Sequence, residues 1–179
     1  MRCRISVALV HAPVLNRQGK TAVTAVTPVD VYDFARSCAF YGVQPVYLVH
    51  PAPAMHRFVE ELCAYWCKGG GARRNPARAQ ALASVRMVSC LQDVLGEVDA
   101  WWYTSARPPA HAPIVSVRDL AWREGRHLLV FGTGCGLDAA ALPEPSGWLS
   151  PIEGDGMVRH LSVRAALSIY LDRLFAGRA

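Results

Sequence analysis

The sequence predicts a single α/β domain, built on a mostly parallel sheet with helices on both faces. Short apolar, β-branched runs alternate along the chain with helical patterns, and this alternation is typical of parallel sheets, whose strands are joined by helical crossovers. The length of 179 residues suits one domain. Hydrophobic residues make up 52% of the chain and charged residues 18%, which excludes a disordered protein and allows a sizeable core. We therefore expect one domain over residues 1–179.

The first half of the chain begins with a buried strand over residues 5–10. A helix over 28–41 follows, with Thr27 as its N-cap, Pro28 in its first turn and Gly42 as its stop. The elements predicted next are a strand at 46–49, a helix around 58–66, a basic flexible loop at 68–76, a helix from about 77, a short strand at 87–90, a helical segment at 91–98 and a strand at 100–103.

The second half begins with a Pro-rich loop over 107–113 and a short helix over 117–122. The run at 127–131 is a buried strand, and a brief strand lies around 148–149. A long helix over about 160–175 closes the chain. In sheets of this type, ligands bind outside the carboxyl ends of the strands, so unusual loops after strands are the places to look for a site.

The formal net charge of +5 and the pI near 9.1 are compatible with a polyanionic partner without requiring one. Lys68, Arg73, Arg74 and Arg78 form a basic patch that flanks glycines and has little apolar content. Such a patch is typical of salt-dependent binding to the phosphates of a nucleic acid. A merely solvated run of charge is the alternative.

The cysteines favour a cytoplasmic protein with reduced thiols over a disulfide framework or a zinc site, since none forms a C-x-x-C pair. No metal is expected. No apolar run has the length of a membrane-spanning helix, and the first residues do not form a signal peptide, so we expect no membrane partner. The six cysteines are Cys3, Cys38, Cys63, Cys67, Cys90 and Cys135.

A glycine loop gives the strongest local signal. Gly132, Gly134 and Gly136 alternate directly after the buried strand at 127–131. Without Cβ atoms, they let backbone N–H groups approach a ligand closely. No Gly-Lys-Ser/Thr follows, which excludes a P-loop, and too little chain remains for a usual dinucleotide fold. A tight turn without a ligand is the alternative.

A second glycine-containing loop, residues 149–156, leads into the predicted last helix. A ligand held between the two loops and a helix N-terminus would meet many backbone donors and few charged groups. That environment suits an adenine edge and a ribose better than a triphosphate.

Three ordered motifs resemble those of the SPOUT superfamily of S-adenosylmethionine-dependent RNA methyltransferases. Residues 27–43 resemble the first motif of the ribose 2′-O-methylating branch, where Asn-Pro-x-Asn precedes an Arg and then Phe-Gly-Val. Residues 131–137 resemble the second motif and 151–165 the third. Together with residues 11–16 and 160–174, they are most similar to a small stand-alone bacterial subfamily.

This resemblance implies a deep trefoil knot over about 128–179, a homodimer whose knotted faces meet, and S-adenosylmethionine as cofactor. It implies an RNA substrate, tRNA or rRNA, with the ribose 2′-oxygen as one candidate acceptor. The cofactor-binding residues that it implies are Thr104, Ser105, Gly132, Thr133, Gly134, Gly136, Pro151, Ile152, Gly156, Leu161 and Ser162. For Thr104 and Ser105, plain strand-ending hydroxyls are the alternative.

Two residues are candidates for catalysis. Arg36 matches the motif Arg and would position the substrate and stabilise charge, because Arg is effectively always protonated. A solvated helix Arg, or a structural partner of Asp33, is the alternative. His160 is a candidate general base, and a helix-capping or packing His is the alternative.

The chain departs from the motifs at several positions. Thr27 and Asp30 stand where the ribose methylases have Asn, and residues 160–164 stand where they have Ser-Leu-Asn-Val-Ser. These differences leave a second hypothesis open, a cofactor- or RNA-binding module with weak or lost activity that acts with a partner methyltransferase. A Rossmann-type oxidoreductase is a third.

Overall fold

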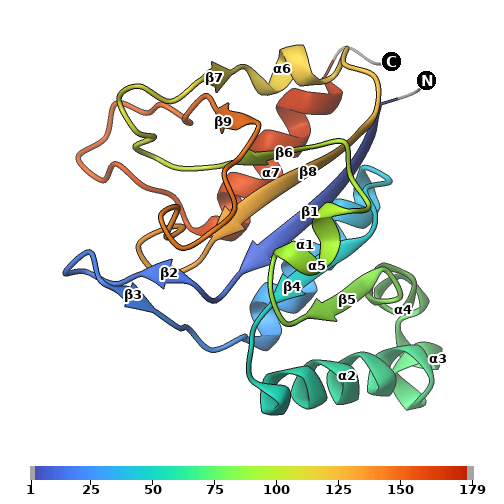
Figure 1. Ribbon diagram of the computed structural model, residues 1–179. Helices are drawn as coiled ribbons and strands as arrows, with labels where there is room; N and C mark the ends of the chain where they lie inside the picture. Colours follow the sequence, from blue (N-terminus) through green and yellow to red (C-terminus); the bar gives the residue numbers. More distant parts are fainter. Residues whose placement is uncertain (1–2, 177–179) are drawn as a thin grey trace.

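Seven strands form one sheet in which every neighbouring pair is parallel (Figure 1). The structure, a computed structural model, describes residues 3–176. From edge to edge the strands are β5 (Val85–Val88), β4 (Val46–Val49), β1 (Arg4–Val10), β8 (Arg126–Gly132), β6 (Ala100–Tyr103), β9 (Gly147–Leu149) and β7 (Ile114–Val115). The predicted α/β class with a mostly parallel sheet is confirmed. A separate hairpin joins β2 (Val14–Leu15) to β3 (Thr21–Ala22).

The strands that come last in the sequence do not lie at an edge of the sheet. β8 lies between β1 and β6, and β9 lies between β6 and β7. Both are therefore inserted between strands formed by earlier parts of the chain. The deep trefoil knot over about 128–179 and the domain limits 1–179 stay predictions, and residues 1–2 and 177–179 lie outside the described part.

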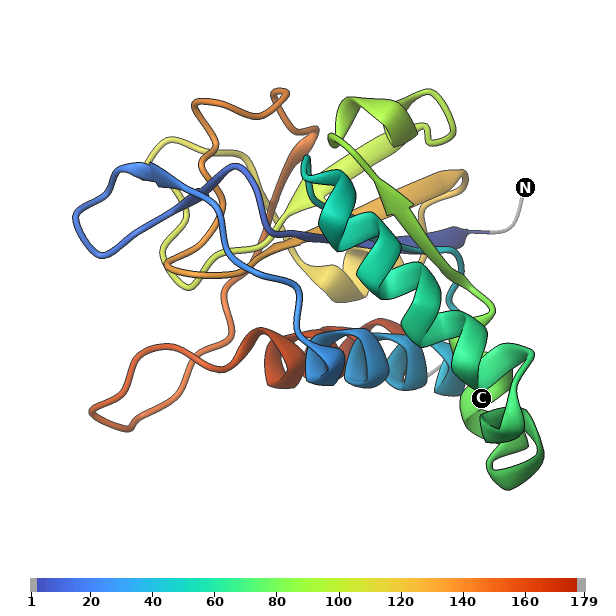
Figure 2. The ribbon, with the colours of Figure 1, turned by 90° about the horizontal axis from the view of Figure 1, so that it is seen from below.

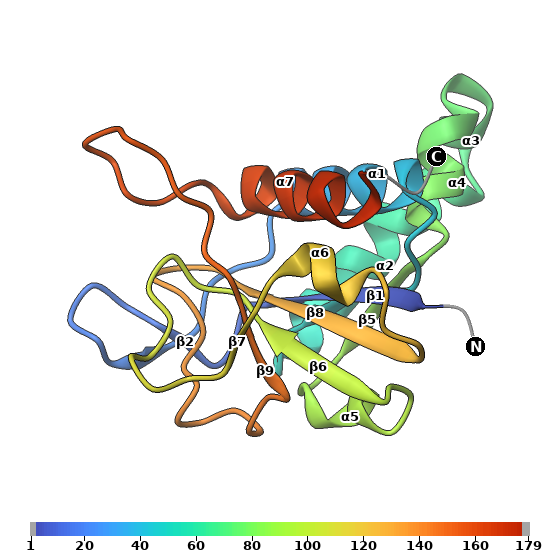
Figure 3. The ribbon, with the colours of Figure 1, turned by 90° about the horizontal axis from the view of Figure 1, so that it is seen from above.

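The helices are distributed unequally between the two faces of the sheet. On one face, α1 (Pro28–Phe40) packs beside α7 (Val163–Phe175), with α2 (Pro53–Cys67), α4 (Pro76–Leu82) and α6 (Val117–Leu120) next to them (Figure 3). Within the described residues, α5 (Gln92–Leu95) is the helix on the other face, where the loop after β8 completes the cover. Both faces are apolar: Val7 and Leu9 point into one core, and Ala8 and Val10 into the other.

The caps of the two central helices explain where these helices begin. The Thr27 side chain accepts from the Asp30 amide at 3.2 Å, so the predicted N-cap of α1 is confirmed. The last helix begins later than predicted, at Val163 instead of about 160. The reason is that the Ser162 side chain accepts from the Ala165 amide and caps the helix there. His160 therefore lies in the segment before the helix.

The predicted flexible loop at 68–76 is wrong, because it contains a short helix, α3 (Gly70–Arg74). Gly71 is buried against α2, and a Cβ there would lie 2.7 Å from Cε3 of Trp66. The glycines thus serve close helix packing here. Asn75 then caps α4 by accepting from the Arg78 amide at 3.0 Å.

Smaller differences concern element ends and thiols. The strand predicted at 87–90 lies at Val85–Val88, and the helical segment predicted at 91–98 shortens to α5. All six cysteines are free thiols. In the described residues, no helix is long and apolar enough to cross a membrane.

Candidate functional site at the carboxyl edge of the sheet

Polar side chains follow the carboxyl ends of the central strands. His11 follows β1, His50 follows β4, Thr104 follows β6 and Thr133 follows β8. Because the strands are parallel, these residues share one edge of the sheet. This is the edge at which ligands bind in open α/β sheets.

A hydrogen-bonded chain connects three of the side chains at this edge. His11 Nδ1 lies 3.2 Å from Oγ1 of Thr24, and that hydroxyl lies 2.5 Å from Oγ1 of Thr133. Thr133 in turn donates to the carbonyl of Val10 at 3.1 Å. The other ring nitrogen of His11, Nε2, is buried and has no hydrogen-bond partner in the described residues. Buried polar atoms are seldom left unpaired, so this nitrogen marks the edge as unusual.

Burial keeps the two histidines at this edge neutral. Loss of hydration lowers the pKa of His11 to about 4, although the nearby Asp30 carboxylate opposes that shift. Burial also lowers the pKa of His50, whose ring centroid lies 6.4 Å from that of His11, and proximity to His56 lowers it further. The edge therefore presents neutral imidazoles at physiological pH.

An ion-paired carboxylate joins the first turns of α1 and α7. Arg164 Nη1 donates to Oδ1 of Asp30 at 2.9 Å, and its Nε lies 3.2 Å from Oδ2 of Asp33. The hydroxyl of Thr27 donates to the second carboxylate oxygen of Asp30 at 2.6 Å. Asp33 is thus paired with Arg164 and not with Arg36, the structural partner considered from the sequence.

The glycine loop is tied to the β2–β3 hairpin. The Cys135 amide donates to the Leu15 carbonyl, and the Leu15 amide donates back to the Gly136 carbonyl, each at 2.9 Å. A Cβ on Gly134, where φ is +61°, would lie 3.0 Å from the Leu15 carbonyl oxygen. A Cβ on Gly132 would lie 2.6 Å from the Leu137 amide nitrogen. Close passage of the chain past itself thus accounts for Gly132 and Gly134 without a ligand.

The amides of this loop are largely occupied within the protein. The N–H groups of Thr133, Cys135, Gly136 and Asp138 all donate to backbone carbonyls. The sequence-based expectation of a loop with many free N–H donors therefore does not extend to these four.

The other predicted cofactor residues lie around the same edge in different environments. Thr104 is buried, and both its amide and its hydroxyl donate to the Val130 carbonyl, as a strand-ending hydroxyl does. The Ser105 hydroxyl accepts from the Arg107 amide at 3.0 Å. Pro151 and Ile152 are half-buried, whereas Gly156 and Leu161 are exposed on the long loop that projects beside α7 (Figure 3).

The two predicted catalytic residues are not brought together by any contact in the described part of the chain. Arg36 is exposed and lies about 12 Å along α1 from its first residue, Pro28. His160 is exposed on the projecting loop. Of the predicted RNA-binding residues, Lys68, Arg73 and Arg74 are exposed and Arg78 is half-buried.

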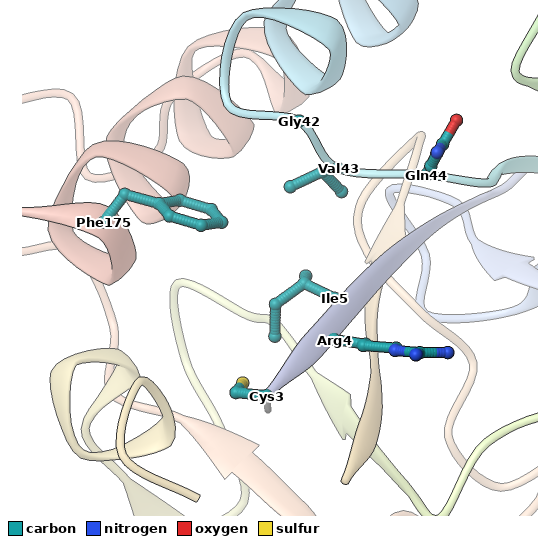
Figure 4. Close-up of a pocket in the computed structure, with 7 residues that line it drawn as sticks. All are labelled: Cys3, Arg4, Ile5, Gly42, Val43, Gln44 and Phe175. Carbon is teal, nitrogen blue, oxygen red and sulfur yellow. The ribbon is translucent and has the colours of Figure 1, made fainter. Parts of the chain in front are cut away.

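Two cavities in the described structure lie away from the carboxyl edge. One, of about 380 Å³, lies at the amino end of β1, where Ile5, Val43 and Phe175 contribute apolar walls (Figure 4). The other, of about 730 Å³, runs along β4 and β5. Neither is lined by the glycine loop or by residues 149–162.

His11, His50 and Arg164 lie outside the set of predicted site residues. The sequence already contains a signal for His11 and His50. Each is a polar residue directly after a buried strand, as Thr104 and Thr133 are. The role of Arg164 depends on α1 and α7 lying side by side, which no local pattern shows.

Comparison with known proteins identifies the family of the chain. Residues 4–176 match the family model of SAM-dependent RNA methyltransferases. The chain belongs to this family. Its cofactor is therefore S-adenosylmethionine, and its members act on RNA.

Two relatives are similar to this chain over nearly its whole length. It is 36% identical over 174 residues to a tRNA (guanine-N(1)-)-methyltransferase of Nitratidesulfovibrio vulgaris, a match that covers 93% of this chain and 41% of that protein. It is 32% identical to an uncharacterised protein of Aquifex aeolicus, covering 96% of this chain and 88% of the relative. The chain thus spans about two fifths of the first relative's length and most of the second's.

The fold is that of the SPOUT-class methyltransferases. The A. aeolicus TrmH/SpoU tRNA modifying enzyme superimposes with a TM-score of 0.60 at 15% identity, covering 97% of this chain and 75% of that chain. At that identity the likeness shows the fold alone.

The side chains that directly follow the central strands at the carboxyl edge are neutral: the imidazoles of His11 and His50 and the hydroxyls of Thr104 and Thr133. The Arg164 guanidinium is already engaged by Asp30 and Asp33. A triphosphate would need several free cations. An adenosyl ligand with one ammonium and one carboxylate needs mainly neutral polar groups.

Proposed function

We propose that the chain is a tRNA methyltransferase that modifies a guanine base. The observation that carries this proposal is the 36% identity to a protein named for tRNA guanine-N1 methylation. Methylation at a ring nitrogen requires a group that takes the proton from that nitrogen. Proton-accepting side chains gather on the exposed loop beside α7, which carries Glu153, Asp155 and His160. Arg36 would stabilise the charge that develops on the base.

The cofactor would lie along the carboxyl edge, between the glycine loop and the loop that precedes α7. A bound sulfonium supplies an already activated methyl group, so the protein must chiefly align the acceptor and remove a proton. We assign the enclosing positions to backbone groups of Gly134, Ile152, Gly156 and Leu161. Thr133 would be held in register by its contact with Thr24.

A second candidate acceptor is a ribose 2′-oxygen. The observation that favours it is Arg36, which stands in the first motif where ribose methylases carry Arg and is exposed on α1. A third possibility is a module that acts with a separate methyltransferase. It draws support from the length of the N. vulgaris relative, of which this chain matches 41%.

A second copy of the chain is the partner that we propose for the apolar part of the projecting loop. Met157 is fully exposed, Val158 is 73% exposed and Leu161 47% exposed. Figure 2 shows this loop extending away from the sheet, beside the start of α7. Substituting Asp at Met157 and Val158 together should shift the particle mass in light scattering from dimer to monomer. A native chain that is already monomeric at micromolar concentration would refute the homodimer.

Nucleoside mass spectrometry tests the proposed activity. The native chain is incubated with methyl-deuterated S-adenosylmethionine and unmodified tRNA, and the digested tRNA is searched for labelled nucleosides. Labelled 1-methylguanosine supports the base assignment, and a labelled 2′-O-methylnucleoside supports the ribose. If calorimetry shows cofactor binding but tRNA from several sources acquires no labelled nucleoside, the module would be supported.

A further inference from the structure

The charge of this chain is concentrated in one segment. Between Leu62 and Gln92 the sequence has no Asp or Glu. The same stretch holds five of the basic residues: Lys68, Arg73, Arg74, Arg78 and Arg86. The whole chain has 19 basic and 14 acidic residues, so the remainder has 14 of each and is neutral. The net charge of +5 therefore belongs to this segment.

Most of the segment forms a helical arm at one end of the molecule, which we define as the end of α2 with α3 and α4; Arg86 lies outside the arm, on β5. Figure 2 shows α3 and α4 at the opposite end from the projecting loop of residues 153–160. Lys68, Arg73 and Arg74 are exposed on this arm, and none has an ion pair or hydrogen bond from its side chain within the described residues. Three free cations so close together in the chain repel one another, and this repulsion favours the binding of an anionic partner there.

Arg78 has a different role from the other basic residues of the arm. Its guanidinium lies 4.9 Å from the ring centroid of Tyr32 and 4.3 Å from that of Trp66. The Trp66 ring nitrogen donates to the Tyr32 hydroxyl at 2.7 Å. This stack joins α1, α2 and α4, so Arg78 holds the arm rigidly on the domain.

The arm that carries the free cations also carries an exposed aromatic ring. Tyr65 is 50% exposed, and its ring meets that of Trp66 edge to face at a centroid distance of 5.2 Å. The contact with Trp66 fixes the ring while leaving part of it open to solvent. Basic side chains on the same surface as a fixed aromatic ring are a combination that binds nucleic acid, with phosphates on the cations and an unpaired base on the ring.

We infer that this arm is a second RNA-docking surface, on which Lys68, Arg73 and Arg74 bind phosphates and Tyr65 stacks on an unpaired base. The inference rests on the proposed RNA methyltransferase function. α2 begins just after the carboxyl end of β4 and has 15 residues, so the end of α2 in the arm lies about 22 Å from its start near the carboxyl edge. The RNA must therefore be folded and long enough to reach both places. A membrane surface is disfavoured, because binding to lipid needs a larger exposed apolar area. Among the described residues of the arm, only Tyr65 is a large apolar side chain that is well exposed.

Binding of unmodified tRNA to the full chain tests the inference. The triple variant Lys68→Ala, Arg73→Ala, Arg74→Ala should bind tRNA at least tenfold more weakly, and the slope of log Kd against log salt should fall by about two. The control, Arg4→Ala with Arg118→Ala, removes two exposed arginines outside the arm and should change the affinity less than twofold. Tyr65→Ala should weaken binding roughly tenfold and Tyr65→Phe should not.

The outcomes separate this inference from the proposed function. If the arm variants raise KM for tRNA and leave kcat and S-adenosylmethionine affinity unchanged, the docking surface is supported. Equal losses in the arm variant and the control would overturn it, and so would unchanged tRNA binding or preferential binding to anionic lipid vesicles. If the native chain binds no tRNA, the proposed function itself fails.

Discussion

Arg164 and Asp30 form an ion pair between α7 and α1, with Nη1 of the arginine 2.9 Å from Oδ1 of the aspartate. Both residues differ from the motifs of the ribose-methylating branch, where Asn stands at the position of Asp30 and Ser at that of Arg164. The two departures thus meet in space. A cation in the first turn of α7 interacts unfavourably with the positive end of the helix dipole. The carboxylates of Asp30 and Asp33 on α1 compensate for this interaction.

Replacing Arg164 by Ala should destabilise the fold, because the Asp30 carboxylate, whose side chain is only 10% exposed, would lose its cation. We expect a loss of about 1–3 kcal/mol in the free energy of unfolding, measured by urea denaturation. The control is Arg126→Ala, which breaks an exposed pair with Asp99 and should cost less than about 1 kcal/mol. Equal costs would contradict a special role for the α1–α7 pair.

Stability should fall as the solution becomes acidic, because His11 is neutral in the fold. Its pKa is lowered from 6.5 to about 4, so the unfolded chain binds the proton more readily. The contribution is present above pH 6.5 and is lost progressively as pH falls toward 4, up to about 3 kcal/mol in all. Asp30 and His50 face the same ring, and the lowered pKa of His50 acts in the same direction. In His11→Asn, urea denaturation at pH 7.5 and 5 should show a smaller difference than in the native chain.

Gly134→Val should disturb the glycine loop at its contact with Leu15. The residue has φ of +61° and a Cβ would lie 3.0 Å from the Leu15 carbonyl oxygen, so the loop must move. We expect a tenfold or greater loss of S-adenosylmethionine affinity in calorimetry. Gly154→Ala is the control, since a Cβ there meets nothing within 4 Å. Unchanged affinity in the valine variant would place the cofactor elsewhere.

Arg36→Ala should leave the fold and cofactor binding intact and remove methyl transfer by at least about a hundredfold. The side chain is exposed and has no ion pair or hydrogen bond within the described residues, so its loss should cost little stability. Incorporation of label into tRNA measures the transfer. Arg118→Ala removes an exposed arginine of α6 and should retain activity. Full transfer by the Arg36 variant would exclude its catalytic role.

The elements that the sequence predicts well are those specified by neighbouring residues. The Thr27 cap, Pro28 and the buried run of β8 lie where local patterns place them. The start of α7 differs from its predicted position because Ser162, and not His160, provides the N-cap. The sequence does not predict α3, because consecutive glycines are typical of loops. Their packing role depends on the contact between Gly71 and Trp66, which are brought together by the fold.

The candidate site was predictable in part for the same reason. The position of the glycine loop after a buried strand is local, and so is the expectation that it lies at the carboxyl edge. The contacts that brace it are not local: Thr133 meets Thr24, and the loop lies against the hairpin at residues 14–22. These pairings depend on strand order, and no single-sequence pattern encodes the insertion of β8 beside β1.

That insertion has a consequence for synthesis on the ribosome. β1 emerges first, yet one of its two sheet neighbours, β8, comes more than a hundred residues later in the nascent chain. Until then the hydrogen-bonding groups along one side of β1 stay unpaired, and β6 has no link to β1. Such non-local pairing is slow and leaves partly made chains prone to aggregate, so we expect truncation before residue 126 to yield chains that chaperones retain.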